Sequence, residues 1–179
     1  MVNRQESIIL LGARGSGKTT VGRSLAQATG RGFIDLDEIL VDRARLSIAE
    51  IFKRYGQPWF RRLESRVLRD GLRAASSRSL IIATGGGVVV RQVNRQWIKR
   101  AKYTCVYLKC DAAELHRRVA ADASSAMNRP ALTAASGIQE VSVLLDQREP
   151  HYVALADLVV NVSTLDTSSV VERVLAAVR

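Results

Sequence analysis

The sequence predicts one α/β domain, 1–179, in which helices cover both faces of a doubly wound parallel sheet of five strands. Two observations predict this fold. Short apolar runs alternate with longer amphipathic stretches along the chain, which is the pattern of repeated strand–helix–strand units. The chain has 179 residues, of which 47% are hydrophobic and 5% aromatic. That length suits one domain with its own core, and the aliphatic composition suits helices packed on a sheet.

The individual elements follow from the periodicity of the apolar residues. The expected strands are the runs Ser7–Leu11, Phe33–Asp35, Leu80–Ala83, Thr104–Leu108 and Leu158–Val162. The expected helices are the stretches Lys18–Ala28, Ile48–Tyr55, Trp59–Ala74, Gln92–Ala101, Ala112–Ala120, Gln139–Ala154 and Ser168–Val178. The segment Ala121–Gly137 lacks apolar periodicity and is rich in small residues. We expect it to be a mobile lid over the site.

The composition argues against several classes of partner. The net charge is +10, from 27 Lys and Arg against 17 Asp and Glu, but no run of five like charges occurs. No aromatic residues alternate with the arginines as they would in a single-stranded nucleic-acid site. No apolar stretch reaches the roughly 18 residues of a membrane span. We therefore expect no nucleic-acid or membrane partner, and the basic charge suits a solvated surface or a site for ATP. A cytoplasmic location and a monomer are the default expectations.

The first expected strand runs into a phosphate-binding loop, Gly12–Thr19. The segment reads GARGSGKT and matches G-x-x-x-x-G-K-[ST] in full, with a strand before it and a helix after it. Glycines let successive N–H groups converge on phosphate oxygens, and the helix points its positive end at the same place. Lys18 can reach the β- and γ-phosphates, and the Thr19 hydroxyl can bind Mg²⁺. The residues expected to bind ATP here are Gly15, Ser16, Gly17, Lys18, Thr19 and Thr20.

Two further strand ends carry groups suited to chemistry. The second strand ends in Asp35-Leu36-Asp37, and on an extended chain residues i and i+2 face the same side. One carboxylate could then hold Mg²⁺ while the other orients a substrate hydroxyl; alternatively, Asp37 caps a helix that begins near Glu38. The third strand runs into Thr84-Gly85-Gly86-Gly87. Three glycines destabilise a loop but allow a ligand to approach the backbone closely, so we expect this loop to border the substrate.

Taken together, these motifs resemble the shikimate kinase family, within the nucleoside-monophosphate-kinase-like P-loop proteins. The matching segments are GARGSGKT, FIDLD, SIAEIF, FRRLE, ATGGG, NRP and QREPHY, in the family's order from about Ser7 to Tyr152. Many families share the phosphate loop, whereas the joint occurrence of DLD, FRRLE and TGGG is far more specific. The resemblance implies strand order 2-3-1-4-5 and transfer of the γ-phosphoryl group of ATP to the 3-hydroxyl of shikimate, with Mg²⁺ as cofactor.

The resemblance also implies roles for individual residues. Asp37 would bind the shikimate hydroxyls and act as base, and Asp35 would lie near Mg²⁺. Arg61 and Arg148 would grip the substrate carboxylate, with Glu64 steadying Arg61. The remaining implied positions are the substrate-pocket glycines Gly85, Gly86 and Gly87, the lid arginine Arg129 near the phosphates, and Arg118 near adenine, with Arg117 as its rival. A forked guanidinium pairs well with a carboxylate, which agrees with two arginines at this substrate.

Other functions remain open at this stage. A related P-loop kinase could act on gluconate or a nucleotide, but two arginines for a carboxylate favour shikimate over a nucleobase. A switch-type nucleotide-binding protein would leave the triple glycine and the paired arginines without use. A non-catalytic nucleotide-binding module would not need Lys18, Thr19, Asp35 and Asp37 together. The sequence departs from the family at Gln57, where an acidic residue is usual, and in a longer lid segment.

Overall fold

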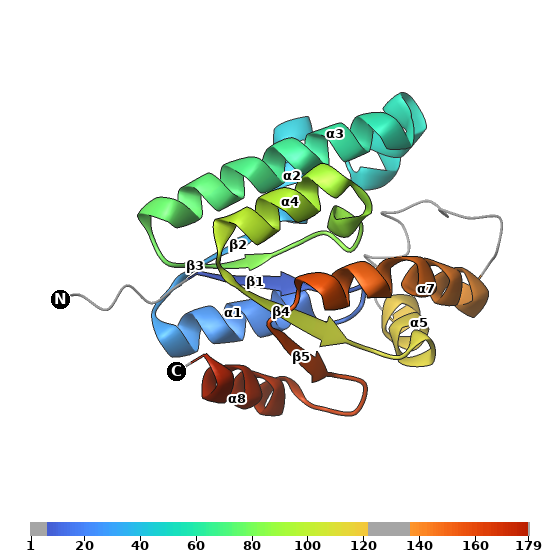
Figure 1. Ribbon diagram of the computed structural model, residues 1–179. Coiled ribbons are helices and arrows are strands. Elements are labelled where there is room, and N and C mark those ends of the chain that lie inside the picture. Colours follow the sequence, from blue (N-terminus) through green and yellow to red (C-terminus); the bar gives the residue numbers. More distant parts are fainter. Residues whose placement is uncertain (1–6, 122–136, 179) are drawn as a thin grey trace.

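The computed structural model describes residues 7–121 and 137–178, and its centre is a parallel sheet (Figure 1). The five strands are β1 (Ile8–Leu11), β2 (Gly32–Asp35), β3 (Leu80–Ala83), β4 (Thr104–Lys109) and β5 (Leu158–Asn161). They pair in the order β2-β3-β1-β4-β5, and all four pairings are parallel. Both the predicted strand order and the predicted strands are confirmed, each strand end to within one residue.

Helices cover both faces of this sheet because its central strands are buried on both sides. In β1, Ile9 and Leu11 belong to one apolar cluster, and Ile8 and Leu10 to the other, as the alternation of side chains along a strand requires. The first cluster packs under α2 (Leu36–Ala44), α3 (Ile48–Ser77), α4 (Gln92–Ala101) and the end of α7 (Gly137–Leu155). The second packs under α1 (Lys18–Thr29), α5 (Ala112–Ala121) and α8 (Thr167–Ala177).

Two helices differ from the sequence-based expectation. The expected helices Ile48–Tyr55 and Trp59–Ala74 form one element, α3, but Gly56 interrupts it with φ 76° and ψ 171°, so a break does separate them. Pro58 lies just past that break, near the start of the second half, where its missing N–H costs no helical hydrogen bond. The short helix α2 follows β2 directly; the sequence raised it only as an alternative, because its first residues were interpreted as extended chain.

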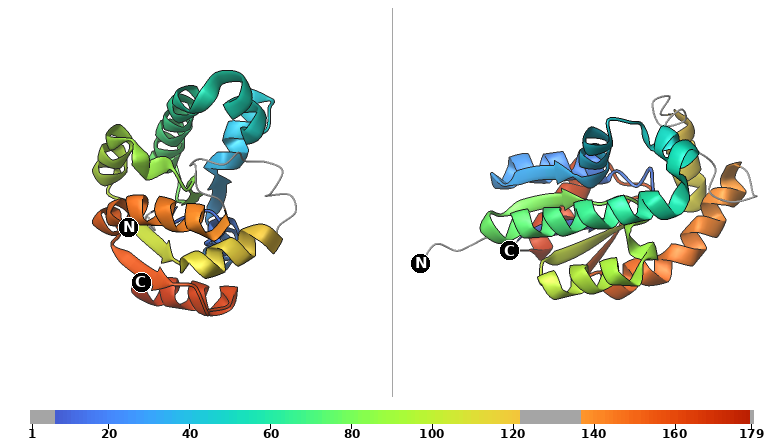
Figure 2. Two further views of the ribbon diagram at one scale, coloured as in Figure 1. Left: turned by 90° about the vertical axis from the view of Figure 1, so that its right-hand side faces the viewer. Right: turned by 90° about the horizontal axis from the view of Figure 1, so that it is seen from above.

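The loops that matter for function all leave the same edge of the sheet. In Figure 1 the arrowheads of β1 and β4 point to the right, and the left panel of Figure 2 looks onto that edge. The segments after β1, β2 and β3 are the phosphate loop, the Asp35–Asp37 turn and the triple glycine. Ligands of open α/β sheets bind outside the carboxyl ends of the strands, so this edge is where a site is expected. No helix among the described residues is long and apolar enough to cross a membrane.

Candidate active site

A cavity of about 960 Å³ opens over the carboxyl edge of the sheet. The phosphate loop and the start of α1 form one wall, Asp35 and Asp37 a second, and the segment between β5 and α8 a third. Gly86 also borders it. The three motifs that the sequence singled out separately therefore meet at a single cavity.

The phosphate loop is shaped by glycine and closed by Lys18. Gly12, Gly15 and Gly17 have φ values of 149°, 83° and 88°, which residues with a side chain rarely adopt. The Lys18 ammonium donates to the carbonyl oxygens of Gly12 at 2.9 Å and Ala13 at 2.7 Å. Helix α1 begins at Lys18 without a side-chain cap and without an acidic residue in its first turn. The positive end of α1 is therefore left for an anion at this loop.

Thr19 and Asp35, the two expected metal ligands, lie in contact. The Thr19 hydroxyl donates to Asp35 Oδ2 at 2.6 Å. The other carboxylate oxygen, Oδ1, accepts from the backbone N–H groups of Asp37 at 2.9 Å and Glu38 at 3.4 Å. Asp35 is thus the N-cap of α2, so the alternative that Asp37 caps this helix is wrong.

The expected geometry of Asp37 also needs correction. Asp37 lies in the first turn of α2 rather than on an extended strand end, so the alternation of side chains along a strand does not account for its direction. It still borders the same cavity as Asp35. A Cβ on Gly85 would lie 2.7 Å from Asp37 Oδ1 and 3.1 Å from Glu64 Oε1. The second glycine loop is therefore in close contact with two carboxylates.

Arg61 and Glu64 form a buried ion pair beside the same loop. Arg61 Nη1 lies 2.8 Å from both carboxylate oxygens of Glu64, and the two side chains are 10% and 6% exposed. A Cβ on Gly87 would overlap the Arg61 guanidinium, so a larger residue there would have to displace it. Within the described residues, Arg61 Nε is buried without a hydrogen-bond partner. Part of the guanidinium is thus committed to Glu64 and part is not.

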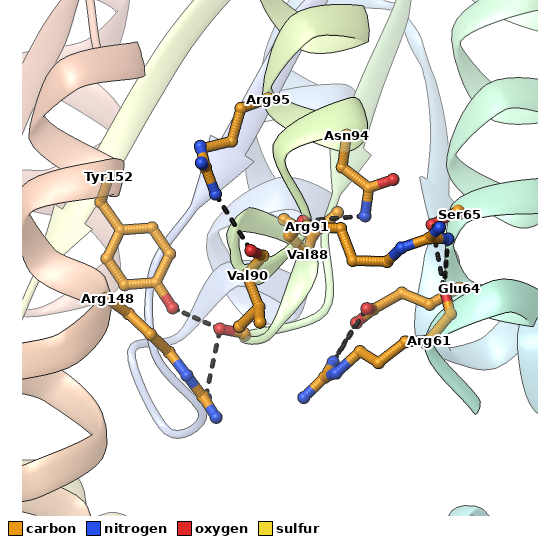
Figure 3. A network of polar contacts seen from close by, with 11 residues as sticks. Arg61, Glu64, Ser65, Val88, Val90, Arg91, Asn94, Arg95, Arg148 and Tyr152 are labelled. Carbon is orange, nitrogen blue, oxygen red and sulfur yellow. Dashed lines mark hydrogen bonds and ion pairs between the residues drawn. The ribbon is translucent and has the colours of Figure 1, made fainter. Parts of the chain in front are cut away.

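Arg148 reaches the second glycine loop from the opposite side. Its Nη1 donates to the Gly86 carbonyl at 3.3 Å, and the Tyr152 hydroxyl donates to the same oxygen. Burial lowers the pKa of the Arg148 guanidinium, and the positive charge of Arg61 lowers it further. Figure 3 shows both guanidinium groups ending on the same side of the network, Arg61 from α3 and Arg148 from α7. Two cations held this close favour an anion between them.

Helix α4 fixes the backbone that follows the triple glycine. Asn94, which is fully buried, donates to the Val88 carbonyl at 2.9 Å, and Arg95 donates to the carbonyls of Val89 at 2.6 Å and Val90 at 3.0 Å. Arg91 donates to the Ser65 hydroxyl at 2.7 Å (Figure 3). Sequence reasoning missed these residues and Tyr152. Nothing in the polar pattern of Gln92–Ala101 marks Asn94 as buried.

The arginines expected near the nucleotide differ in where they lie relative to the cavity. Arg118 borders the cavity and donates to the Val162 carbonyl at 2.7 Å, close to the wall formed by β5 and α8. Arg117 is 69% exposed and pairs with Glu114, so of these two neighbours only Arg118 lies at the cavity. Arg129 and the expected lid, apart from its end residues Ala121 and Gly137, lie outside the described residues.

A phosphate loop after the first strand, in a parallel sheet of this order and beside a second glycine loop with two arginines, defines a P-loop kinase of small molecules. Comparisons with known proteins specify the family. The shikimate kinase family model matches residues 14–179. The chain belongs to the shikimate kinase family.

Individual relatives agree with this assignment. The chain is 38% identical over 168 residues to a shikimate kinase of Bordetella avium, which covers 94% of this chain and 77% of that protein. It is 40% identical over 156 residues to shikimate kinase 2 of Dickeya chrysanthemi, covering 87% of each. A solved structure of the Acinetobacter baumannii shikimate kinase in complex with shikimate matches with a TM-score of 0.87 at 30% identity, over 98% of this chain and 94% of that one.

Proposed function

We propose that the protein transfers the γ-phosphoryl group of ATP to the 3-hydroxyl of shikimate, giving shikimate 3-phosphate and ADP. One observation of the structure supports this most directly. The guanidinium groups of Arg61 and Arg148 approach the glycine loop that also contacts Asp37, and this loop adjoins the phosphate loop. A substrate with both a carboxylate and a hydroxyl would use the two features at once.

The two arginines would hold the substrate through its carboxylate. Arg61 keeps Nε unpaired within the described residues, and Glu64 holds Nη1 of that guanidinium in place. Arg148 would contribute a second fork from α7. Because Glu64 balances Arg61, one net positive charge remains with Arg148, so a carboxylate here is favoured over a neutral group.

Asp37 would orient the acceptor hydroxyl and accept its proton. The hydroxyl oxygen would then attack the γ-phosphorus, the bond to the β–γ bridging oxygen would break, and ADP would leave. Lys18 would stabilise the charge on the transferring group when its ammonium turns from the carbonyls of Gly12 and Ala13 to the phosphates. Catalysis of this kind consists mainly of positioning and electrostatic stabilisation.

Mg²⁺ fits the oxygens at the Thr19–Asp35 contact, where a hydroxyl and a carboxylate oxygen lie 2.6 Å apart. The ion would neutralise charge on the phosphates of ATP. Mg²⁺ keeps several waters and needs only one or two protein oxygens, so the lack of a cluster of three acidic, His or Cys side chains among the described residues is compatible with it. Use of ATP, together with two free cysteines, supports a cytoplasmic location.

A gluconate kinase is an alternative that the fold also allows. A gluconokinase of Sinorhizobium meliloti matches with a TM-score of 0.59 at 17% identity, which is similarity of fold only. A coupled assay of ADP release across shikimate, gluconate and nucleoside monophosphates separates the candidates. We expect turnover with shikimate that is at least about 100-fold more efficient than with nucleoside monophosphates, which have no carboxylate for the two arginines. Gluconate also carries a carboxylate, so the assay itself decides between it and shikimate, and we expect shikimate to be the better substrate. Equal or better turnover with gluconate would reject the proposal.

A further inference from the structure

The carbonyl group of Gly86 lies between the phosphate-binding part and the carboxylate-binding part of the site. It accepts hydrogen bonds from Tyr152 and from Arg148 (Figure 3). On its other side Gly86 lies against the phosphate loop, because a Cβ there would be 3.0 Å from the Arg14 backbone nitrogen and 3.4 Å from the Ala13 carbonyl carbon. One peptide group is therefore packed between the loop for ATP and the arginine for the carboxylate.

Tyr152 is the more firmly held of the two donors to this oxygen. Its side chain has no exposed surface, and its ring stacks on Tyr107 of β4 with centroids 5.0 Å apart and an interplanar angle of 24°. Burial raises the pKa of Tyr152 to about 12, so the hydroxyl remains a donor at neutral pH. Arg148, in contrast, is only partly buried, and its contact with Gly86 is long at 3.3 Å.

Arg148 and Tyr152 lie one helical turn apart on α7, and residues at i and i+4 share a helix face. Both meet the Gly86 carbonyl, so the glycine loop fixes the distance between α7 and the substrate pocket. When Arg148 turns to a carboxylate, its weak bond to Gly86 can lengthen. The Tyr152 bond does not compete with substrate and can keep the loop in place throughout.

We infer that Tyr152 is a positioning residue for the substrate carboxylate: its hydroxyl fixes the Gly86 carbonyl and, through that shared oxygen, sets the position of the Arg148 guanidinium. This inference rests on the proposed function, because it concerns how Arg148 meets shikimate. It differs from a purely structural role, in which the hydroxyl would only satisfy a buried carbonyl and would not influence one substrate more than the other.

The test compares Tyr152→Phe with Tyr107→Phe. Both changes delete one hydroxyl from a fully buried, stacked ring, but the Tyr107 hydroxyl contacts Glu149 at 3.4 Å instead of Gly86. For Tyr152→Phe we expect KM for shikimate to rise about three- to tenfold, because one neutral hydrogen bond is lost. KM for ATP should change less than about twofold. Tyr107→Phe should leave KM for shikimate within about twofold of wild type.

A second arm tests whether the effect passes through Arg148. In an Arg148→Ala background, Tyr152→Phe should change KM for shikimate by less than about twofold, because there is no guanidinium left to position. Effects that multiply in the double variant would overturn the inference. So would an equal rise in both KM values, or loss of the cooperative thermal transition in Tyr152→Phe alone. If wild type does not phosphorylate shikimate, the proposed function fails instead, so the two failures are distinguishable.

Discussion

The two glycine loops at the carboxyl edge of the sheet contain glycine for different physical reasons. In the phosphate loop, Gly12, Gly15 and Gly17 have φ values between 83° and 149°, so the backbone itself excludes a side chain. In the second loop, no glycine from Gly85 to Gly87 has a positive φ. There the exclusion comes from neighbours: added Cβ atoms on Gly85 and Gly87 would meet functional side chains, and one on Gly86 would meet the backbone of the phosphate loop.

This difference decides what each loop can do. The phosphate loop binds through its backbone, because it presents N–H groups and a helix end to phosphate oxygens. The second loop acts through packing, because its lack of side chains leaves room for carboxylates and guanidinium groups to approach one another. Gly85 borders Asp37 and Glu64, and Gly87 borders Arg61. The comparison predicts that changes at the first loop act on phosphoryl transfer and changes at the second act on the acceptor.

The largest expected effect is at the carboxylate beside Gly85. Asp37→Asn keeps the shape of the side chain but removes the base. We expect kcat to fall about 10²- to 10⁴-fold, the usual contribution of a general base, while an ATP analogue binds as it does to wild type. The measurement is steady-state kinetics at saturating shikimate with the chemical step rate-limiting. A loss below about threefold would leave Asp37 without a role in proton transfer.

Lys18→Ala should give the next largest loss. The variant removes the charge that would stabilise the transferring phosphoryl group, and loss of one such electrostatic contact lowers kcat about 10²- to 10³-fold. Shikimate binding should remain, because the Lys18 ammonium donates to Gly12, Ala13 and Ser16 of the phosphate loop. Isothermal titration with shikimate checks this point. Near-normal kcat in a folded variant would contradict the proposed mechanism.

Conservative changes to the two arginines should have smaller and more selective effects. Arg61→Lys and Arg148→Lys keep the charge but cannot reproduce the guanidinium fork. Each should raise KM for shikimate roughly ten- to hundredfold, equivalent to about 1.5–3 kcal/mol for a charged hydrogen bond. KM for ATP should move much less. If both variants handle shikimate like wild type, the carboxylate is bound elsewhere.

Much of this arrangement could be predicted from the sequence, and the reasons for the failures are physical. The strands and the phosphate loop were predictable because burial on both faces and left-handed glycines impose strict local patterns. The role of Asp35 as a helix cap was missed, because DLD after a strand fits an extended chain as well as a helix start. Tyr152 was missed because its partner, the Gly86 carbonyl, is 66 residues away in sequence. Asn94 was missed although the Val88 carbonyl is only six residues away, because no apolar periodicity marks this polar side chain as buried.

The most direct test of the division between the loops uses two glycine-to-alanine variants. Gly87→Ala introduces no dihedral strain, since Gly87 has φ −103°, but its methyl group would displace the Arg61 guanidinium. Gly30→Ala, the control, adds a methyl group with nothing within 4 Å at a φ of 65°, so it should lower Tm by a few degrees, for about 1 kcal/mol, and change no binding.

The deciding measurement is calorimetric titration of Gly87→Ala with shikimate and, separately, with an ATP analogue. We expect at least about a tenfold loss of shikimate affinity, with affinity for the ATP analogue close to wild type. The thermal transition should stay cooperative but at a lower Tm, because displacing Arg61 disturbs its buried pair with Glu64. If Gly87→Ala binds shikimate like wild type, or loses both ligands equally, the second glycine loop is not the acceptor half of the site.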